Sequence, residues 1–448
     1  MSDSSNMVIK SSDLASHLKN DTRVKVSGCD IDGIARGKIM STEKFLKAAE
    51  EGFGFCNVTF GWDMHDKTYD PNVFPNKTRE TAYPDILARP DLSSLRRIPW
   101  DDNVPHFLLD FYTPDTNKPY PFCPRALLKR VVKQCEKAGY MPFCGMEYEF
   151  FNFKETPETL ASKQGQDLKQ LTPGMFGYSL LRPTLNQSYF NSIYSSCLSY
   201  RIPIEGFHTE TGPGVYEAAL AYTDALEMAD RAHLFKTAAK QIGMQYGIMP
   251  SFMAKPHSNL PGCSGHIHFS LKSISTKESV FEMKETEDSI NKICRQFIAG
   301  ILTALPSLLP LFAPTVNSYK RLVENYWAPT TTSYGLQNRT SAIRLIPPSR
   351  IEFRVPGADV NPYLAIAGCL AAGVWGIENE LELKDVPVQR LPGDLKEATI
   401  KMLEEGSVAR KVLGDEFIEH FGGTRVAEWK EWCGTVTAWE RIRYMETV

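Results

Sequence analysis

The sequence lacks the features that would place it in several large classes of protein. Its ten cysteines stand singly, with no C-x-x-C pair, which excludes the common zinc and redox motifs. No block of lysine or arginine interrupts a nearly balanced charge of 50 basic against 53 acidic residues, so we expect no nucleic-acid partner. There is no G-x-G-x-x-G fingerprint, and residues 33–38 lack the spacing and the hydroxyl residue of a P-loop.

Long hydrophobic segments are also scarce. The first 18 residues contain no continuous apolar segment of the kind found in leader peptides. We take Tyr363 to Ile377 as the longest apolar stretch, and it is too short and too rich in small residues to span a bilayer. We therefore expect a cytoplasmic protein with no membrane partner, whose reduced cysteines mostly pack in the interior.

The chain is long enough for two or three domains. Asp32-Gly33 separates two strand-like segments and predicts a tight hairpin in a small β-rich domain. We place this domain at residues 1–115 and a larger one at 116–448, where a helix at 124–138 precedes a strand at 141–153. The other expected helices are at about 222–243, 287–305, 361–380 and 395–412, and the other strands at about 248–253, 265–271, 342–346 and 351–355. The predicted class is α+β with a mainly antiparallel sheet.

Two pairs of carboxylates are candidates for chemistry. Glu147 and Glu149 lie two residues apart in a β-prone segment, so both should project from one face of a strand and attract a cation. A solvated strand face is the alternative, although the flanking phenylalanines favour burial. Glu210 and Glu217 flank a turn rich in glycine and proline, which would return both carboxylates to one site.

Imidazoles and guanidiniums follow later in the chain. His266 and His268 also alternate on one predicted strand face, beside glycines, where a neutral imidazole can bind a metal. Arginine offers a fixed fork of donors that suits phosphate and carboxylate oxygens. The candidate arginines are Arg321, Arg339, Arg344, Arg350 and Arg354, and Glu352 lies near the last of them. The alternative is that these arginines only form a solvated basic face.

In this order, the segments resemble the type I glutamine synthetases and their relatives that form γ-glutamylamines, across about residues 23–440. The resemblance implies a β-grasp-like N-terminal domain and a catalytic α/β domain whose curved antiparallel strands line a funnel, with ATP and glutamate entering at opposite ends. It implies Mg²⁺ or Mn²⁺, at least two ions per site. One ion would be held by Glu149, Glu210 and Glu217, and the other by Glu147, His266 and Glu352.

The same resemblance implies roles for further residues. The implied substrate-binding residues are Arg321, His268, Gly262, Trp327 and Asp63. The implied nucleotide-binding residues are Arg339, Arg344, Ser270 and His208, and the implied catalytic residues are Arg339, Arg354 and Trp327. The family forms rings with sites between neighbouring subunits, so the resemblance implies a ring-forming, dodecamer-like homo-oligomer.

The sequence departs from the family pattern at Trp327, where members that use ammonia carry a glutamate. A tryptophan face attracts an alkylammonium group, while Asp63 or Asp66 would pair with a distal ammonium; alternatively, Trp327 only packs. We therefore expect an ATP-dependent ligase that joins a polyamine or alkylamine to glutamate. The alternatives are glutamine synthesis from ammonia and a non-catalytic structural or developmental protein.

Overall fold

The computed structural model describes residues 11–69, 83–286, 289–324 and 326–448. Two expectations fall in part outside the described residues: the one about a leader peptide, at residues 1–10, and the start of the helix expected from residue 287. The helices are α1 Ser11–His17, α2 Thr42–Glu51, α3 Pro124–Lys137, α4 Pro157–Ser162, α5 Gln187–Ser199, α6 Ala225–Gln245, α7 Lys292–Phe312, α8 Pro362–Glu378, α9 Leu395–Leu403, α10 Val408–Leu413, α11 Asp415–Cys433 and α12 Ala438–Tyr444.

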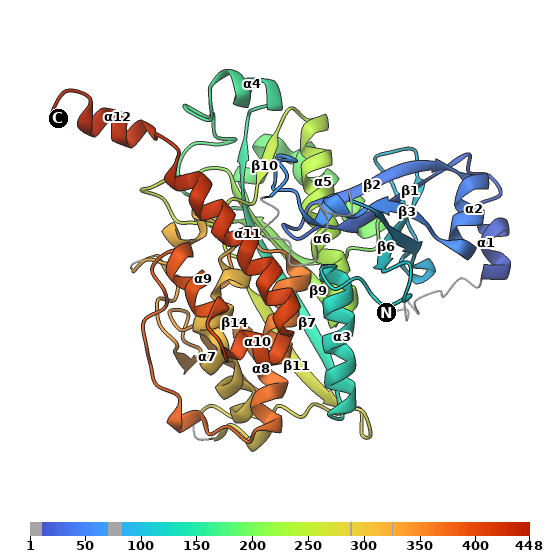
Figure 1. Ribbon diagram of the computed structural model, residues 1–448. Coiled ribbons are helices and arrows are strands. Elements are labelled where there is room, and N and C mark those ends of the chain that lie inside the picture. Colours follow the sequence, from blue (N-terminus) through green and yellow to red (C-terminus); the bar gives the residue numbers. More distant parts are fainter. Residues whose placement is uncertain (1–10, 70–82, 287–288, 325) are drawn as a thin grey trace.

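The strands form two separate sheets (Figure 1). The N-terminal sheet has the order β2-β1-β6-β4-β3, with β5 also paired to β6. The larger sheet has the order β12-β13-β14-β11-β7-β9-β8, with β10 also paired to β7. The strands are β1 Arg23–Cys29, β2 Ala35–Ser41, β3 Phe53–Cys56, β4 Asp85–Pro90, β5 Arg96–Ile98, β6 Val104–Tyr112, β7 Tyr140–Phe153, β8 Ile204–Thr209, β9 Val215–Asp224, β10 Met249–Ser251, β11 Ile267–Ser273, β12 Tyr334–Leu336, β13 Ile343–Ile346 and β14 Arg350–Phe353.

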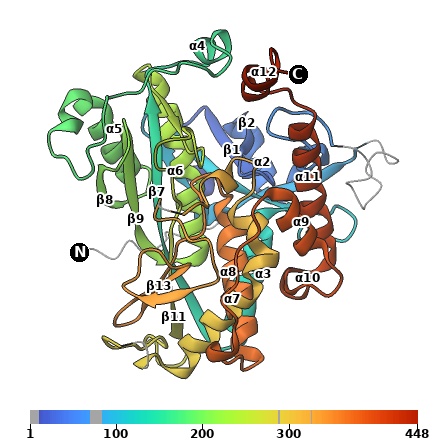
Figure 2. The same cartoon turned by 90° about the vertical axis from the view of Figure 1, so that its left-hand side faces the viewer.

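The predicted class is confirmed, because helices pack against a mainly antiparallel, curled sheet (Figure 2). In the larger sheet the one parallel pair between the strands described is β12 with β13. The hairpin of β1 and β2 turns at Gly33, whose φ of +85° is a conformation that glycine adopts without steric cost. A small core between the N-terminal sheet and α1 and α2 is separate from the main core of the larger sheet and its helices.

Alternation along β7 decides which side of the larger sheet carries polar groups. Tyr148 and Phe150 are fully buried, and both rings lie against Phe235 of α6. Because side chains alternate along a strand, Glu147 and Glu149 point to the opposite face. The face of the sheet that the helices cover therefore belongs to the core, and the opposite face carries the polar candidate residues.

Two expectations about helices need correction. The single helix expected at 395–412 is two helices, α9 and α10, because Gly406 has a φ of +73° and the Ser407 side chain caps α10. The apolar stretch from Tyr363 is not the longest, since α7 has 21 residues. Of the residues described, α7 alone is long and apolar enough to cross a membrane, yet 72% of its apolar window is buried inside the protein. It packs against α8 and α9 as a core helix.

All ten cysteines are free. Eight of them are buried, and only Cys56 and Cys433 are exposed, which agrees with the expectation that most of them pack in the interior. Burial raises the pKa of the Cys135 thiol to about 12 and that of Cys123 to about 11, so these groups stay protonated at neutral pH.

Candidate active site

Strand register carries the candidate residues across the polar face of the larger sheet in a continuous row. Arg344 on β13 lies opposite Glu352 on β14, and Glu352 lies opposite His268 on β11. On the other side of β7, Glu149 lies opposite Glu217 on β9, and Glu217 lies opposite His208 on β8. Residues that are separated by up to about 200 positions in the chain therefore meet because of strand pairing alone.

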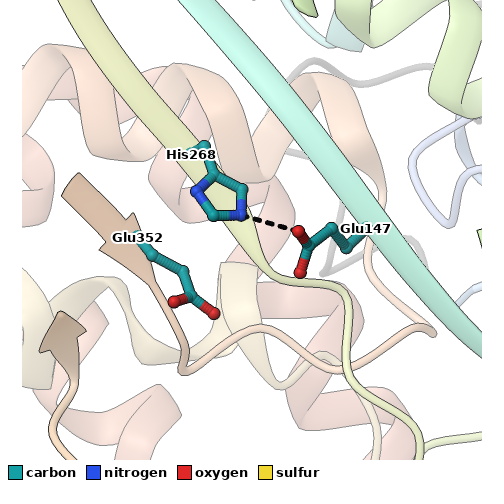
Figure 3. A group of neighbouring side chains, drawn as sticks. All are labelled: Glu147, His268 and Glu352. Carbon is teal, nitrogen blue, oxygen red and sulfur yellow. Dashed lines mark hydrogen bonds and ion pairs between the residues drawn. The ribbon is translucent and has the colours of Figure 1, made fainter. Parts of the chain in front are cut away.

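The first group of the row surrounds Glu147 (Figure 3). His268 Nε2 lies 2.9 Å from Glu147 Oε1, and each of Glu147, His268 and Glu352 offers a ligand atom within 4.8 Å of the others. His266 reaches the same group, with Nδ1 3.3 Å from Glu352 Oε1 and 3.8 Å from Glu147 Oε2. Both histidines thus approach the carboxylates, although only His266 was expected to be a metal ligand.

The pKa values in this group favour charged carboxylates and a neutral imidazole. Burial would raise the pKa of Glu147, but hydrogen bonding to His266 and His268 outweighs it and lowers the pKa below its usual range. Burial, followed by the nearby Arg354, lowers the pKa of His266 to about 4. At neutral pH the group therefore presents anionic oxygens beside a neutral ring, which suits a divalent cation.

The second group lies around Glu217. His208, Glu210 and Glu217 offer ligand atoms within 4.8 Å of one another, and His208 Nε2 is 3.6 Å from Glu217 Oε1. Glu149 is the cross-strand neighbour of Glu217 and accepts a hydrogen bond of 2.7 Å from the Ser264 backbone N–H. The turn between β8 and β9 passes through Gly212 and Gly214, so it returns Glu210 and Glu217 to one place, as its composition predicted.

The pKa values of Glu149 and His208 in this second group are both raised above their usual range. Burial, followed by the charge of Glu217, raises the pKa of Glu149 to about 7. The neighbouring Glu217 carboxylate in turn raises the pKa of His208 to about 9. Anionic groups held this close repel one another unless a cation lies between them, so the second group also fits a divalent ion.

Arginines border the carboxylates. Arg344 donates to Glu352 Oε2 over 3.0 Å, and Arg354 forms a shorter ion pair with Glu352. Arg354 also donates over 2.9 Å to the carbonyl of Arg339, whose own side chain is exposed. Positive groups beside an acidic ion site are the arrangement needed to hold phosphate oxygens.

Arg321 is buried at the edge of the acidic groups. Its guanidinium donates to the carbonyl oxygens of Val355 over 2.8 Å and of Arg354 over 3.2 Å. Gly262 makes room for it, because a Cβ on this residue would lie 3.0 Å from Arg321 Cγ and 2.4 Å from the carbonyl oxygen of Ala254. Arg321 and Gly262, which were both expected to bind substrate, are therefore in contact.

Among the described residues, the other predicted side chains show no hydrogen bond or ion pair to this cluster. Ser270 shares a hydrogen bond of 2.9 Å with Tyr222. Asp63 accepts from the backbone of its own loop, and Asp66 pairs with Arg36 over 2.5 Å, so both carboxylates are engaged within the N-terminal domain. Trp327 is 67% exposed, which argues against the alternative that it only packs within this chain.

Tyr178 is a residue that the sequence analysis missed. Its ring stacks on His208, with centroids 4.4 Å apart. Although the residue is 69% exposed, partial burial followed by the charge of Glu210 raises its pKa. It lies in an irregular segment without periodicity, so nothing in the sequence indicated that it would reach the acidic group. The hydrogen bond of 2.7 Å from its backbone N–H to the carbonyl of Thr209 places it there.

Comparison with known proteins shows the family to which the chain is similar. Residues 121–444 match the family described as "Glutamine synthetase, catalytic domain". The chain is 47% identical over 442 residues to type-1 glutamine synthetase 2 of Dictyostelium discoideum, covering 95% of this chain and 84% of that protein. It is 32% identical over 458 residues to the glutamate–isopropylamine ligase of a Pseudomonas species, covering 98% of each. A solved structure of GmaS with ADP superposes with a TM-score of 0.83 at 28% identity, covering 97% of this chain and 99% of that one.

Proposed function

This chain belongs to the glutamine synthetase family, and from that premise we propose that it joins a primary amine, a polyamine or an alkylamine, to the γ-carboxylate of glutamate with ATP. The single observation that carries the proposal is the row of two carboxylate–imidazole groups beside buried arginines. Such a row matches the charges of ATP, two divalent ions and an amino-acid substrate.

The chemistry explains why both kinds of charge are needed. A carboxylate is a poor acyl donor, so a γ-carboxylate oxygen first attacks the γ-phosphorus of ATP, and ADP leaves. The amine nitrogen then attacks the carbonyl carbon of γ-glutamyl phosphate, phosphate leaves, and the nitrogen loses a proton. The products are ADP, phosphate and a γ-glutamyl amide.

The residues have distinct tasks in these steps. Mg²⁺ or Mn²⁺ held by the two groups would neutralise the phosphate oxygens of ATP. Arg339, Arg344 and Arg354 stabilise the negative charge that grows on the transferred phosphoryl group. Arg321 holds the substrate carboxylate at the buried end of the row. We assign Glu210, whose charge acts on Tyr178, a second task besides holding an ion: its carboxylate attracts the incoming ammonium and accepts its proton.

Purified protein with ATP, Mg²⁺ and glutamate, tested against a panel of primary amines, provides the direct experiment. We expect phosphate release that depends on both glutamate and amine. No release with any amine or with ammonia would leave the non-catalytic alternative, in which the clustered charge has another use.

Glutamine synthesis from ammonia is the second candidate. The 47% identity to a protein named as a type-1 glutamine synthetase favours it. The tryptophan at position 327, in place of the glutamate expected for ammonia-using members, favours an organic amine instead. A higher kcat/KM for ammonia than for every amine in the panel would decide for glutamine synthesis.

A further inference from the structure

A cavity of about 320 Å³ lies beside the second acidic group, at the edge strand β8 of the larger sheet. This volume is at the small end of the range of about 300–1,000 Å³ that is typical of small-molecule sites. The residues that line it are Tyr178, Ser179, Leu180, Pro183, Thr184, Gln187, Phe190, Asn191, Phe207 and His208.

The cavity and the acidic group share a wall. Tyr178 and His208 line the cavity, and His208 also belongs to the group with Glu210 and Glu217. The segment that carries Tyr178 is fixed to β8, because the Ser179 backbone N–H donates over 2.9 Å to Thr209 Oγ1. The charge of Glu210 also raises the pKa of Tyr178 in the cavity wall, so the substituent of a substrate whose nitrogen lies near Glu210 can reach the cavity.

Aromatic rings form one side of the cavity and are held in place by other rings. Phe190 and Phe207 stack with centroids 4.0 Å apart, and Tyr216 packs edge-on against both, at 5.1 and 5.7 Å. Rings fixed in this way offer apolar surface without having to reorganise when a ligand binds. A flat aromatic substituent would gain both apolar contact and ring-to-ring packing there.

Apart from His208, whose pKa is raised to about 9, the polar part of the lining is neutral. Thr184, Gln187 and Asn191 contribute a hydroxyl and two amides, and none of the lining residues is a carboxylate. A second ammonium, such as a polyamine carries, would lose water of hydration here without gaining a counter-charge. The hydroxyl and amide groups of the lining therefore suit an uncharged substituent.

We infer that the acceptor amine is a primary amine with an uncharged aromatic substituent, which occupies this cavity while its nitrogen lies near Glu210. The inference rests on the proposed function and narrows its substrate class, away from polyamines. It also explains why a cavity with three aromatic rings adjoins a strongly acidic site.

Acceptor specificity tests the inference separately from the ligase activity. Hydroxylamine, a small nucleophile that needs no side pocket, reports γ-glutamyl phosphate formation through γ-glutamyl hydroxamate. With 2-phenylethylamine, ethylamine and 1,4-diaminobutane as acceptors, we expect kcat/KM for 2-phenylethylamine to be at least about tenfold above the other two. Equal values, or a preference for the diamine, with hydroxamate still formed would overturn the inference and leave the proposed function standing.

A matched pair of variants on α5 tests the position of the substituent. Asn191→Asp adds a carboxylate to the lining, so the preference for 2-phenylethylamine over 1,4-diaminobutane should fall about tenfold. Ser188→Asp adds the same charge to the same helix at an exposed position outside the lining. It should leave kcat/KM unchanged for both amines. An unchanged preference in Asn191→Asp would contradict the inference, whereas failure to form hydroxamate in the unmodified protein would contradict the proposed function itself.

Discussion

Individual side chains at the site are constrained mainly by charge. Glu352 is 1% exposed and lies between Arg344, Arg354 and His266. Burial would raise its pKa, but His266 and Arg354 lower it, so it remains ionised. A buried anion with two guanidinium partners and an imidazole is both a structural and a metal-binding group.

The variant Glu352→Gln separates these two roles. Removing the charge leaves two guanidinium groups without a counter-ion, and we expect a loss of stability of about 3–5 kcal/mol. The Mn²⁺ affinity of the first group should fall by at least about 100-fold, so added Mn²⁺ should raise the Tm of the variant less than that of the unmodified protein, whose two groups both bind. Glu431→Gln, which removes an exposed carboxylate paired with Lys67, is the control and should keep the Mn²⁺ effect.

Glu149 predicts how the metal-free protein responds to pH. Its pKa of about 7 is above the ordinary value of 4.5, so between these two values the folded state binds a proton that the unfolded state has lost. Stability from this group is therefore full below pH 4.5 and decreases as the pH rises towards 7. Urea unfolding from pH 5 to 7.5 should show this decrease, and Glu149→Gln should remove that part of it.

Metal binding reverses the proton balance at Glu149. Because a metal ligand must be deprotonated, Mn²⁺ affinity should rise with pH up to about 7. Calorimetry at pH 6.5 in two buffers with different ionisation enthalpies should detect proton release on binding. Release of equal size in Glu149→Gln would show that another group supplies the proton.

At the scale of elements, the hairpin of β8 and β9 brings the second acidic group together. Gly214 has a φ of +76°, and a Cβ there would lie 3.0 Å from both the Asn152 carbonyl oxygen and Leu171 Cβ. Asn152 also donates to the carbonyl of Gly214 over 2.9 Å. The turn therefore needs glycine for its conformation and for its close approach to β7.

Substituting this glycine should affect stability and metal binding together. Gly214→Ala should cost about 1–3 kcal/mol in the free energy of unfolding and weaken Mn²⁺ binding, because the strands that carry Glu210 and Glu217 must shift. Gly247→Ala is the matched control, since Gly247 has a φ of +65° but a Cβ on it would meet no atom within 4 Å. It should cost about 1–2 kcal/mol through backbone strain alone and leave Mn²⁺ binding unchanged. Equal effects of both substitutions would show that crowding at Gly214 is unimportant.

At the scale of the whole molecule, two features suit a homo-oligomer of the ring-forming kind. Asp63 and Asp66 do not join the acidic groups within one chain, as their contacts lie in the N-terminal domain. The C-terminal helix α12 projects from the body (Figure 1), and Trp439 and Ile442 on it are 60% and 86% exposed. We propose that a neighbouring subunit completes the site and covers the exposed apolar side chains of this helix.

Mixed subunits test whether sites are shared. We expect each variant to be inactive alone. Asp63→Ala lacks the carboxylate that would reach the site of the neighbouring subunit, and Arg339→Ala lacks an arginine of the catalytic domain. Dissociating and reassembling them together should restore up to about a quarter of the activity, since one combination in four pairs two intact halves. No recovery in mixed assemblies that sedimentation shows to be complete would remove Asp63 from the shared site.

The sequence alone determined the residue types and their local geometry. Three features depend only on neighbouring residues, so they could be interpreted without coordinates. They are the alternation around Glu147 and Glu149, the Asp32-Gly33 turn and the glycine-rich turn after Glu210. The order of these motifs was also sufficient to indicate the family, which comparison with known proteins then confirmed. The helix expected at 395–412 failed for a local reason, the turn at Gly406.

Only the tertiary structure decided which side chains meet. The contacts of His268 with Glu147, of Glu149 with Glu217 and of Tyr178 with His208 depend on strand order and register, or on how a loop lies on an edge strand. These pairings join segments far apart in the chain, and a shift of one residue would turn each side chain to the other face. The cavity beside β8 exists for the same reason, because packing between distant segments created a space that no local pattern in the sequence encodes.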